Sequence, residues 1–299
     1  MLRLYRILFP ALIVLGQFAA AAEKQDAKLQ PIAYAKPLKI ADLANQKITE
    51  SSGLAASRRT KDAFWTHNDS GGRPRIYAFN AKGEDLGTFD ITGAQAADWE
   101  DMASATIGKT PYLLLGDVGD NNARRKTCTI YLVKEPTLPA GKKPVTGKIN
   151  VAKTIRFEYA DGPHNCESIA IDPATRTIYL VSKTALPACK VYALPIPRGE
   201  RLATANPVAV LKIPITTAMD ISPDGLRCIV LTYGHAYEYA RKPDEKWKDA
   251  FGREPREIKM PGRAQGESIC YGSDGKTLYL TSEKLPTPLW EVPAVVGDN

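Results

Sequence analysis

Three glutamates in this chain open short apolar runs in the same way: Glu100 in DWEDMASATI, Glu167 in NCESIAID and Glu267 in GESICYG. If the fold brings these carboxylates together, they repel one another and are costly to desolvate, and a bound cation would neutralise them. Oxygen-only ligands favour Ca²⁺, whereas Zn²⁺ would prefer histidine or cysteine. We therefore expect Glu100, Glu167 and Glu267 to hold Ca²⁺. The alternative, that they accept backbone hydrogen bonds or pair with Lys183 and Lys284, stays open.

Three further side chains near these glutamates are suited to acid–base chemistry. His67 lies two residues before Asp69, His164 lies three residues before Glu167, and Lys183 ends the second apolar run after Glu167. A histidine beside a carboxylate can act as a general base. We therefore predict His67, His164 and Lys183 as the catalytic residues if the protein hydrolyses a substrate. The sequence contains no GxSxG, no Gly-rich phosphate loop and no HExxH, which argues against serine hydrolases, nucleotide-binding proteins and zinc proteases.

More polar side chains stand where the second apolar run of a unit ends, and we predict that they line a ligand-binding rim around the glutamates. The stretch 116–122, GDVGDNN, resembles a short calcium loop but lacks the EF-hand spacing, so an Asp- and Gly-rich turn is the favoured interpretation. Trp99 and Asp101 flank Glu100 and belong to the same rim. The predicted binding residues are Asn68, Asp69, Trp99, Asp101, Asp117, Asp120, Asn121, Glu283 and Lys284.

The elements that must position these residues recur as five related units, which begin near Ser51, Trp99, Cys166, Thr217 and Gly266. Each unit has two apolar runs, and in three units the turns DPATR, SPDGL and GSDGK supply the φ angles that tight reversals need. A third, aromatic-rich run follows, as in RIYAFNA and KVYALPI, and four units then add a fourth run. Four strands in roughly 40–50 residues predict an all-β fold, a β-propeller of five four-stranded blades.

The last unit runs out of residues before its fourth strand. We expect the N-terminal segment 36–43, KPLKIADL, to fill that place, because closing the ring removes free sheet edges. The segment 136–150 reads as a Pro-, Gly- and Lys-rich loop, and the one helical candidate is 242–252. Six blades remain an alternative if residues 24–50 or that loop hide another sheet, and a pair of five-stranded sandwiches is a third.

The N-terminus has the pattern of an export signal. Two arginines precede an apolar run over residues 7–18, and small residues follow up to Ala22. The run is shorter than the ~20 residues that a membrane span needs. We predict a signal peptide at 1–22, a linker at 23–35 and a single propeller domain at 36–299, in a periplasmic or secreted protein with no membrane span after cleavage.

Charge and cysteine content narrow the possible partners. The formal charge is +7, and it falls to about +5 without the two arginines of the signal. Since this charge is spread over short clusters, we expect no nucleic-acid partner. Five cysteines, an odd number without CxxC spacing, leave at least one thiol unpaired within the chain. Cys166 and Cys189 could form a disulfide, while Cys228 and Cys270 are expected to be small core residues.

The motifs WTHNDSGG, DWEDMA, GDVGDN, GPHNCESIAIDP and DISPDG, with QGESI followed by TSE, resemble a family of exported bacterial β-propeller proteins. That family is distantly similar to the regucalcin-like, NHL and SdiA-regulated propellers and to the esterase-like phytase relatives. The resemblance covers nearly all of residues 48–292. It implies a propeller fold, and a wider superfamily that contains hydrolases, lactonases and binding modules alike.

These observations favour one function and leave two others open. The favoured one is an exported binding or scaffold protein with an acid-lined central channel and a rim site for a small-molecule or envelope ligand. The alternative is a Ca²⁺-dependent hydrolase of phosphoesters, esters or lactones, in which the glutamates hold the ion. A third is a structural or interaction protein whose channel is plugged.

Overall fold

The computed structural model describes residues 31–69, 71–139, 141 and 143–295. Within these residues the regular secondary structure consists of β-strands and one short helix. The predicted signal peptide lies outside the described residues, as do residues 23–30 of the predicted linker. In the part of the chain that is described, no helix combines the length and apolar character required to cross a membrane.

The described strands form five antiparallel runs, each of four neighbouring strands, and two short outer strands. The first run is β3 (Ser51–Ala56), β4 (Ala63–Asn68), β5 (Arg75–Asn80) and β6 (Asp85–Thr92). The second is β7 (Trp99–Ile107), β8 (Thr110–Asp117), β9 (Cys128–Lys134) and β10 (Val145–Tyr159). The third is β11 (Cys166–Asp172), β12 (Thr177–Ser182), β13 (Cys189–Pro195) and β14 (Ala203–Leu211). The fourth is β15 (Thr216–Ile221), β16 (Arg227–Thr232), β17 (Ala236–Ala240) and β18 (Arg256–Ile258). The fifth is β19 (Ser268–Tyr271), β20 (Leu278–Thr281), β21 (Pro288–Val292) and β2 (Leu38–Asp42).

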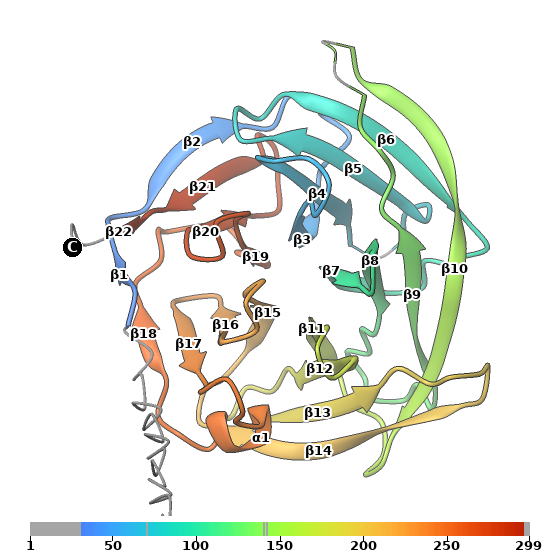
Figure 1. The fold of residues 1–299 in the computed structure, drawn as a ribbon, viewed down its shortest axis with the longest axis vertical. Coiled ribbons are helices and arrows are strands. Elements are labelled where there is room, and N and C mark those ends of the chain that lie inside the picture. The colour runs from blue at the N-terminus through green and yellow to red at the C-terminus, as the bar shows by residue number, and fades with distance from the viewer. Residues whose placement is uncertain (1–30, 70, 140, 142, 296–299) are drawn as a thin grey trace, which may run out of the picture.

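The five runs stand around a common centre (Figure 1). The first strand of each run, which is β3, β7, β11, β15 or β19, lies nearest the centre, and the last strand lies at the circumference. Each inner strand contacts the next, and β19 contacts β3, so the inner strands form a closed circle. The arrangement is therefore propeller-like, in agreement with the all-β prediction.

The turns between first and second strands follow from their residue types. In SPDGL the Asp224 carboxylate accepts the backbone N–H of Leu226, and Gly225 has a φ of 70°. In GSDGK Asp274 accepts the N–H of Lys276 in the same way, and Gly275 has a φ of 68°. A glycine tolerates this left-handed conformation without steric cost. These turns return each second strand to the end at which the first one began.

The N-terminal segment supplies the fourth strand of the last run, as the sequence predicts. β2 pairs antiparallel with β21, with Leu38 opposite Glu291 and Asp42 opposite Pro288. The fold also extends one step further toward the N-terminus. Ala33–Tyr34 forms β1, which pairs with β22 (Ala294–Val295). Residues 33 and 34, assigned above to the linker, are therefore part of the folded structure.

The prediction of a loop over 136–150 is wrong for its second half. Residues 145–150 are the first part of β10 and pair in parallel with β6, with Val145 opposite Gly87 and Asn150 opposite Thr92. The next part of β10 pairs with β9, and its end pairs with β14. Exposed and half-buried residues alternate along the first part of the strand, because one face remains in solvent. The many polar residues of this segment therefore concealed a strand of period two.

The core lies between adjacent runs and contains the tryptophans Trp65, Trp99 and Trp247, all fully buried. All five cysteines are buried and free, so the disulfide considered between Cys166 and Cys189 is not formed. Because their side chains are buried in the core, we interpret these cysteines as small core residues rather than metal ligands.

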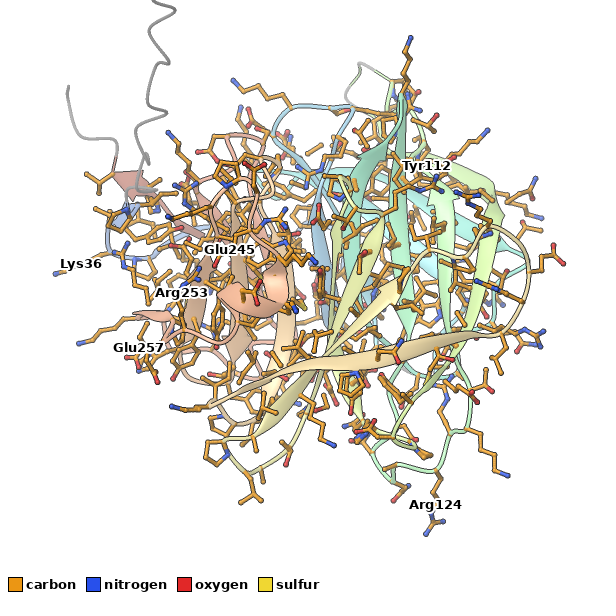
Figure 2. The ribbon with its side chains drawn as sticks, turned by 60° about the horizontal axis from the view of Figure 1, so that its bottom comes forward. Lys36, Tyr112, Arg124, Glu245, Arg253 and Glu257 are labelled. Atoms are coloured by element: carbon orange, nitrogen blue, oxygen red, sulfur yellow. The ribbon has the colours of Figure 1, made fainter. Side chains whose placement is uncertain are left out.

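A short helix, α1 (Trp247–Ala250), interrupts the fourth run inside the segment predicted to be helical. Trp247 anchors it, and the Arg241 guanidinium lies 4.7 Å from the Trp247 ring. Glu245 and Arg253 lie beside the helix in Figure 2 and form an ion pair. This insertion is peripheral and does not approach the inner strands in Figure 1.

Candidate functional site

A repeated backbone irregularity creates the candidate site at the end of the ring where the inner strands begin, which we call the mouth. In β3, β7, β11 and β15 the pairing with the second strand shifts register near the first residue. A bulge of this kind places extra residues opposite one partner and redirects their side chains. In the fifth run the corresponding residue, Glu267, directly precedes β19. The residues at these positions are Ser52, Glu100 with Asp101, Glu167, Thr217 and Glu267.

Glu100 is a buried acid of the mouth with a raised pKa. Glu100 is only 4% exposed. One carboxylate oxygen each from Asp69, Asp98 and Glu100 lie within 4.8 Å of one another. Burial, followed by the charges of Glu167, Asp69 and Asp98 and a hydrogen bond with Glu167, raises the pKa of Glu100 to about 11. Without a cation, Glu100 therefore holds a proton at neutral pH.

A glycine makes the close approach of two of these carboxylates possible. A Cβ atom at position 119 would overlap Oε1 of Glu100 and lie 2.5 Å from Oδ2 of Asp98. The Gly119 N–H donates to the backbone carbonyl of Asp98, 3.1 Å away, which fixes the loop against the carboxylates. Any larger residue at position 119 would push the acids apart.

Glu167 joins the acids to a lysine. Its Oε2 lies 3.0 Å from Nζ of Lys183, and its Oε1 accepts a hydrogen bond from Nδ2 of Asn165 at 2.9 Å. Burial opposes a charge on Lys183, but the Glu167 carboxylate and the Tyr233 hydroxyl together outweigh burial and raise the pKa of the lysine. Asn165 also accepts the backbone N–H of Asp120 at 2.8 Å and donates to Oδ1 of Asn121 at 3.2 Å. The predicted pairing of Glu167 with Lys183 is thus present, in addition to its contact with Glu100.

Glu267 belongs to the other half of the same network. The Tyr233 hydroxyl donates to Oε1 of Glu267 at 2.8 Å, and Nζ of Lys183 lies 3.1 Å from that hydroxyl. Burial, together with a hydrogen bond and repulsion from Glu267, raises the pKa of Glu283 to about 8. Polar contacts therefore run from Glu100 through Lys183 and Tyr233 to Glu283. Carboxylates outnumber the lysine in this chain of contacts.

The two histidines predicted to be catalytic lie in different surroundings. His67 is buried, its Nδ1 lies 3.0 Å from the Asn68 carbonyl, and its ring meets Trp99 edge-on. Burial lowers the pKa of His67 to about 4, so it stays neutral and is placed in the core behind the mouth. His164 instead pairs with Asp161 at 3.0 Å and packs against the rings of Tyr159 and Tyr192.

Several residues predicted to line the rim have partners within the fold. Trp99 is buried and donates from Nε1 to the Gln95 carbonyl at 2.8 Å, so it does not shape the rim. Asp101 is fully buried and accepts three backbone N–H groups. Four further predicted residues make contacts within the fold: Asn68 accepts the N–H groups of Thr49 and Glu50, Asp117 pairs with Arg125, Asp120 accepts the Arg125 N–H, and the backbone N–H of Lys284 donates to the Thr49 carbonyl. The roles of these side chains in ligand binding stay predictions.

The sequence reasoning missed Asp98, Asn165 and Tyr233, although a signal for two of them exists. Asp98 and Asn165 stand two residues before Glu100 and Glu167, as Gln265 does before Glu267. In these three runs the backbone carbonyl at this position accepts an N–H from the segment that follows the second strand. Aligning the units two residues further toward the N-terminus would therefore have revealed a second repeated position at the mouth.

Comparisons with known proteins give little beyond the geometry. No protein-family model matches the chain, and no curated protein matches it. Among solved structures, the chain is similar to a candidate 6-phosphogluconolactonase from Bacteroides uniformis, with 13% sequence identity and a TM-score of 0.40. The similarity covers 83% of this chain and 68% of the other.

Proposed function

We propose that this chain is a five-bladed β-propeller that binds Ca²⁺ at its mouth and uses the ion to hold an oxygen-rich ligand. Five blades are favoured over six because the two segments that could have supplied another sheet have other partners. Residues 38–42 pair with β21, and residues 145–150 pair with β6. The observation that carries the function is the burial of Glu100 among other carboxylates, with Lys183 directed to Glu167 instead.

The donor atoms at the mouth fit Ca²⁺ better than a transition metal. Asp69, Asp98 and Glu100 offer only carboxylate oxygens, which suit the six to eight oxygen ligands and irregular geometry of Ca²⁺. Zn²⁺ prefers nitrogen or sulfur ligands, and the nearby His67 is buried against Gly53. We therefore place the ion among these three acids, with Glu167 next to it. The roles of Glu167 and Glu267 as direct ligands stay predictions.

Titration with Ca²⁺ tests this site. Calorimetry on the whole chain, purified without chelator and then treated with EDTA, is expected to show saturable binding with a Kd on the order of 10⁻⁵–10⁻³ M. Gly119→Ala should weaken binding about tenfold or more, because its Cβ displaces two ligands. Gly262→Ala is the matched control, since a Cβ there meets nothing within 4 Å. Absence of any heat or melting shift with millimolar Ca²⁺ in the unaltered protein would refute the site.

A bound ion gives the mouth a means of capturing ligands. Acidic side chains rarely fill all coordination positions of Ca²⁺, and the remaining positions accept oxygens from water or a ligand. Lys183 and the Tyr233 hydroxyl lie beside the acids and can donate hydrogen bonds to such a ligand. The loops of the mouth are tied to strands by the hydrogen bonds described above, so the site is preorganised. We propose an exported binding or scaffold protein on this basis.

A hydrolase is the second candidate, and the Lys183–Tyr233 contact favours it. Bound Ca²⁺ would polarise a phosphoester, ester or lactone oxygen. Lys183 would then hold the negative charge that develops on the substrate, and Glu283, with a pKa of about 8, could exchange a proton near neutral pH.

Substrate turnover separates the two candidates. The hydrolase should release product from a phosphomonoester, a carboxylic ester or a lactone, and EDTA should abolish this activity. Lys183→Met should lower kcat about 100-fold while retaining measurable Ca²⁺ binding. Lys190→Met is the matched control, because that lysine pairs with Asp161 outside the network. Saturable Ca²⁺ binding without turnover of any of the three substrates would support the binding protein and exclude hydrolysis of these model substrates.

A further inference from the structure

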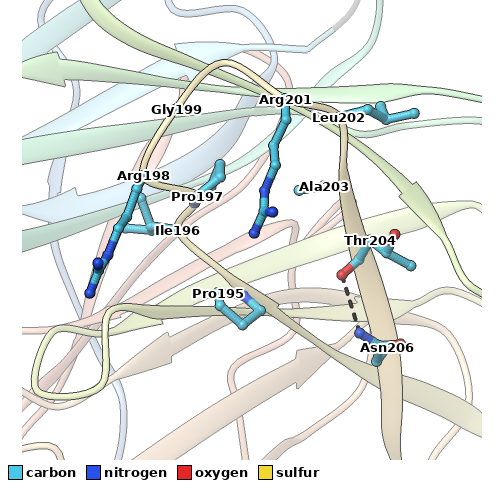
Figure 3. Close-up of a pocket in the computed structure, with 10 residues that line it drawn as sticks. All are labelled: Pro195, Ile196, Pro197, Arg198, Gly199, Arg201, Leu202, Ala203, Thr204 and Asn206. Atoms are coloured by element: carbon cyan, nitrogen blue, oxygen red, sulfur yellow. Dashed lines mark hydrogen bonds between the residues drawn. The ribbon is translucent and has the colours of Figure 1, made fainter.

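Two adjoining hollows lie on the outside of the ring, where the turn between β13 and β14 meets β10. The first, of about 790 Å³, is formed by the turn itself and the start of β14 (Figure 3). The second, of about 760 Å³, lies between the tip of the turn and the middle of β10. Both are lined by Arg198 and Gly199, so they adjoin one another at the tip of the turn. This region is formed by outer strands and is separate from the inner-strand glutamates of the mouth.

Positive charge dominates the lining of these hollows. Arg198 and Arg201 project from the turn in Figure 3, and Lys153 and Arg156 approach from β10. Glu200 is the acidic residue in the lining. The side chains of Arg156, Arg198 and Arg201 make no ion pair or hydrogen bond with the described residues. Their guanidinium groups therefore retain their full capacity to bind an anion in bidentate fashion.

The hollows are held in shape without a ligand. Nζ of Lys153 donates to the Gly199 carbonyl at 3.1 Å, which ties the tip of the turn to β10. At the base of the turn, β14 pairs in parallel with the end of β10 through residues 203–205. A charged surface that is already shaped loses less conformational entropy when it binds.

The shape and the lining identify the kind of anion. Two hollows in a row, joined at Arg198, fit an extended chain with repeated negative groups better than a single small ion. The lining contains no aromatic side chain on which bases could stack, which disfavours single-stranded nucleic acid. The hydroxyls of Thr92, Thr154 and Thr204 and the amide of Asn206 can bond to sugar hydroxyls. We propose that this surface binds a linear acidic polysaccharide that carries carboxylate or sulfate groups.

The test measures binding of fluorescently labelled heparin and alginate to the whole chain at several salt concentrations. The double variant Arg198→Gln, Arg201→Gln should weaken binding of at least one of them about tenfold, and the slope of log Kd against log salt should fall by about two. Arg124→Gln with Lys126→Gln is the matched control. It removes the same charge from a loop at the mouth, where Arg124 extends into solvent (Figure 2), and should leave binding unchanged.

Three results would overturn the proposal. One is an equal loss in the control and the double variant, which would mean that only net charge matters. Another is tighter binding of oligo-dT, or of vesicles with anionic lipids, than of both polysaccharides. The third is undiminished polysaccharide binding by the double variant. Ca²⁺ titration of the Arg198→Gln, Arg201→Gln variant should be unaffected, so failure here and failure of the Ca²⁺ site can be told apart.

Discussion

Replacing Glu100 with glutamine is expected to raise the melting temperature of the ion-free protein at pH 8 by several degrees and to remove its stabilisation by Ca²⁺. Burial and the neighbouring acids raise the pKa of Glu100 to about 11 from an ordinary value of 4.5. A group with a raised folded pKa contributes stability that is complete below the unfolded pKa and is lost as pH rises toward the folded one. The ion-free protein should therefore lose stability between about pH 4.5 and pH 8. Glutamine has no proton to lose and can still donate to Glu167.

The same proton makes Ca²⁺ binding depend on pH in the opposite direction. Since the ion needs the ionised carboxylate, binding releases the proton from Glu100, and affinity should rise by up to about tenfold per pH unit. Melting curves at pH 5 and pH 8, with and without Ca²⁺, measure both effects, and about 1 kcal/mol corresponds to roughly 2–4 °C. Glu158→Gln is the control, because Glu158 is exposed on β10. An unchanged pH slope and an unchanged Ca²⁺ response in Glu100→Gln would show that Glu100 is ionised and holds no ion.

This opposition has a physical meaning for the mouth. A carboxylate held among other carboxylates destabilises the ion-free protein. Ion binding at the mouth would offset this destabilisation. The Ca²⁺ site would then resemble other functional sites, at which local strain or repulsion is relieved by the ligand. Gly119 contributes to the same effect, because its missing side chain lets the acids approach.

The repeat was readable from the sequence because each unit carries its own local signals. Turns such as SPDGL and GSDGK, and the alternation of apolar residues, act within a few residues and need no knowledge of the rest of the fold. The closing strand was predictable by counting, since the last unit lacked a strand and 36–43 matched the missing pattern. The first half of β10 was not, because its outer face is solvated and its partner β6 belongs to the preceding unit.

The candidate site was predictable in position but not in contacts. Aligning the units placed Glu100, Glu167 and Glu267 at one repeated position, and register shifts lie at Glu100 and Glu167. Which acids meet depends on side chains from adjacent runs, such as Asp69 and Asp98, and on a lysine that reaches Glu167. Asp69 and Glu100, for example, are more than 30 positions apart in the sequence, so no local pattern encodes their contact.

Asp101 shows the limit most clearly, because the sequence cannot distinguish it from its neighbour Glu100. The shift in β7 turns Glu100 to the mouth and Asp101 inward. There its Oδ1 accepts the N–H of Met102 at 2.8 Å, and its Oδ2 accepts those of Ile169 at 2.9 Å and Met219 at 3.1 Å. One carboxylate thus links β7, β11 and β15 at the centre of the ring.

Asp101→Asn is therefore expected to lower the free energy of unfolding by about 3–5 kcal/mol, although the side chain keeps its size. An amide has one acceptor oxygen, so its NH₂ group would face at least one buried N–H donor, whichever way the amide is turned. Each buried donor left unpaired costs about 1–3 kcal/mol. Urea unfolding of the ion-free protein measures the loss, as a lower midpoint with an unchanged slope.

Asp220→Asn is the graded comparison for this effect. Asp220 is buried too, but each of its oxygens accepts one backbone N–H, from Ile221 at 2.8 Å and from Tyr271 at 2.9 Å. The amide leaves one donor unpaired here as well, but only one remaining hydrogen bond loses its charged acceptor, against two in Asp101→Asn, so we expect a smaller cost than for Asp101→Asn. Asp249→Asn on the exposed side of α1 should cost almost nothing. Equal midpoints for the Asp101 and Asp220 variants would mean that the third hydrogen bond of Asp101, which links a third inner strand, adds nothing to stability.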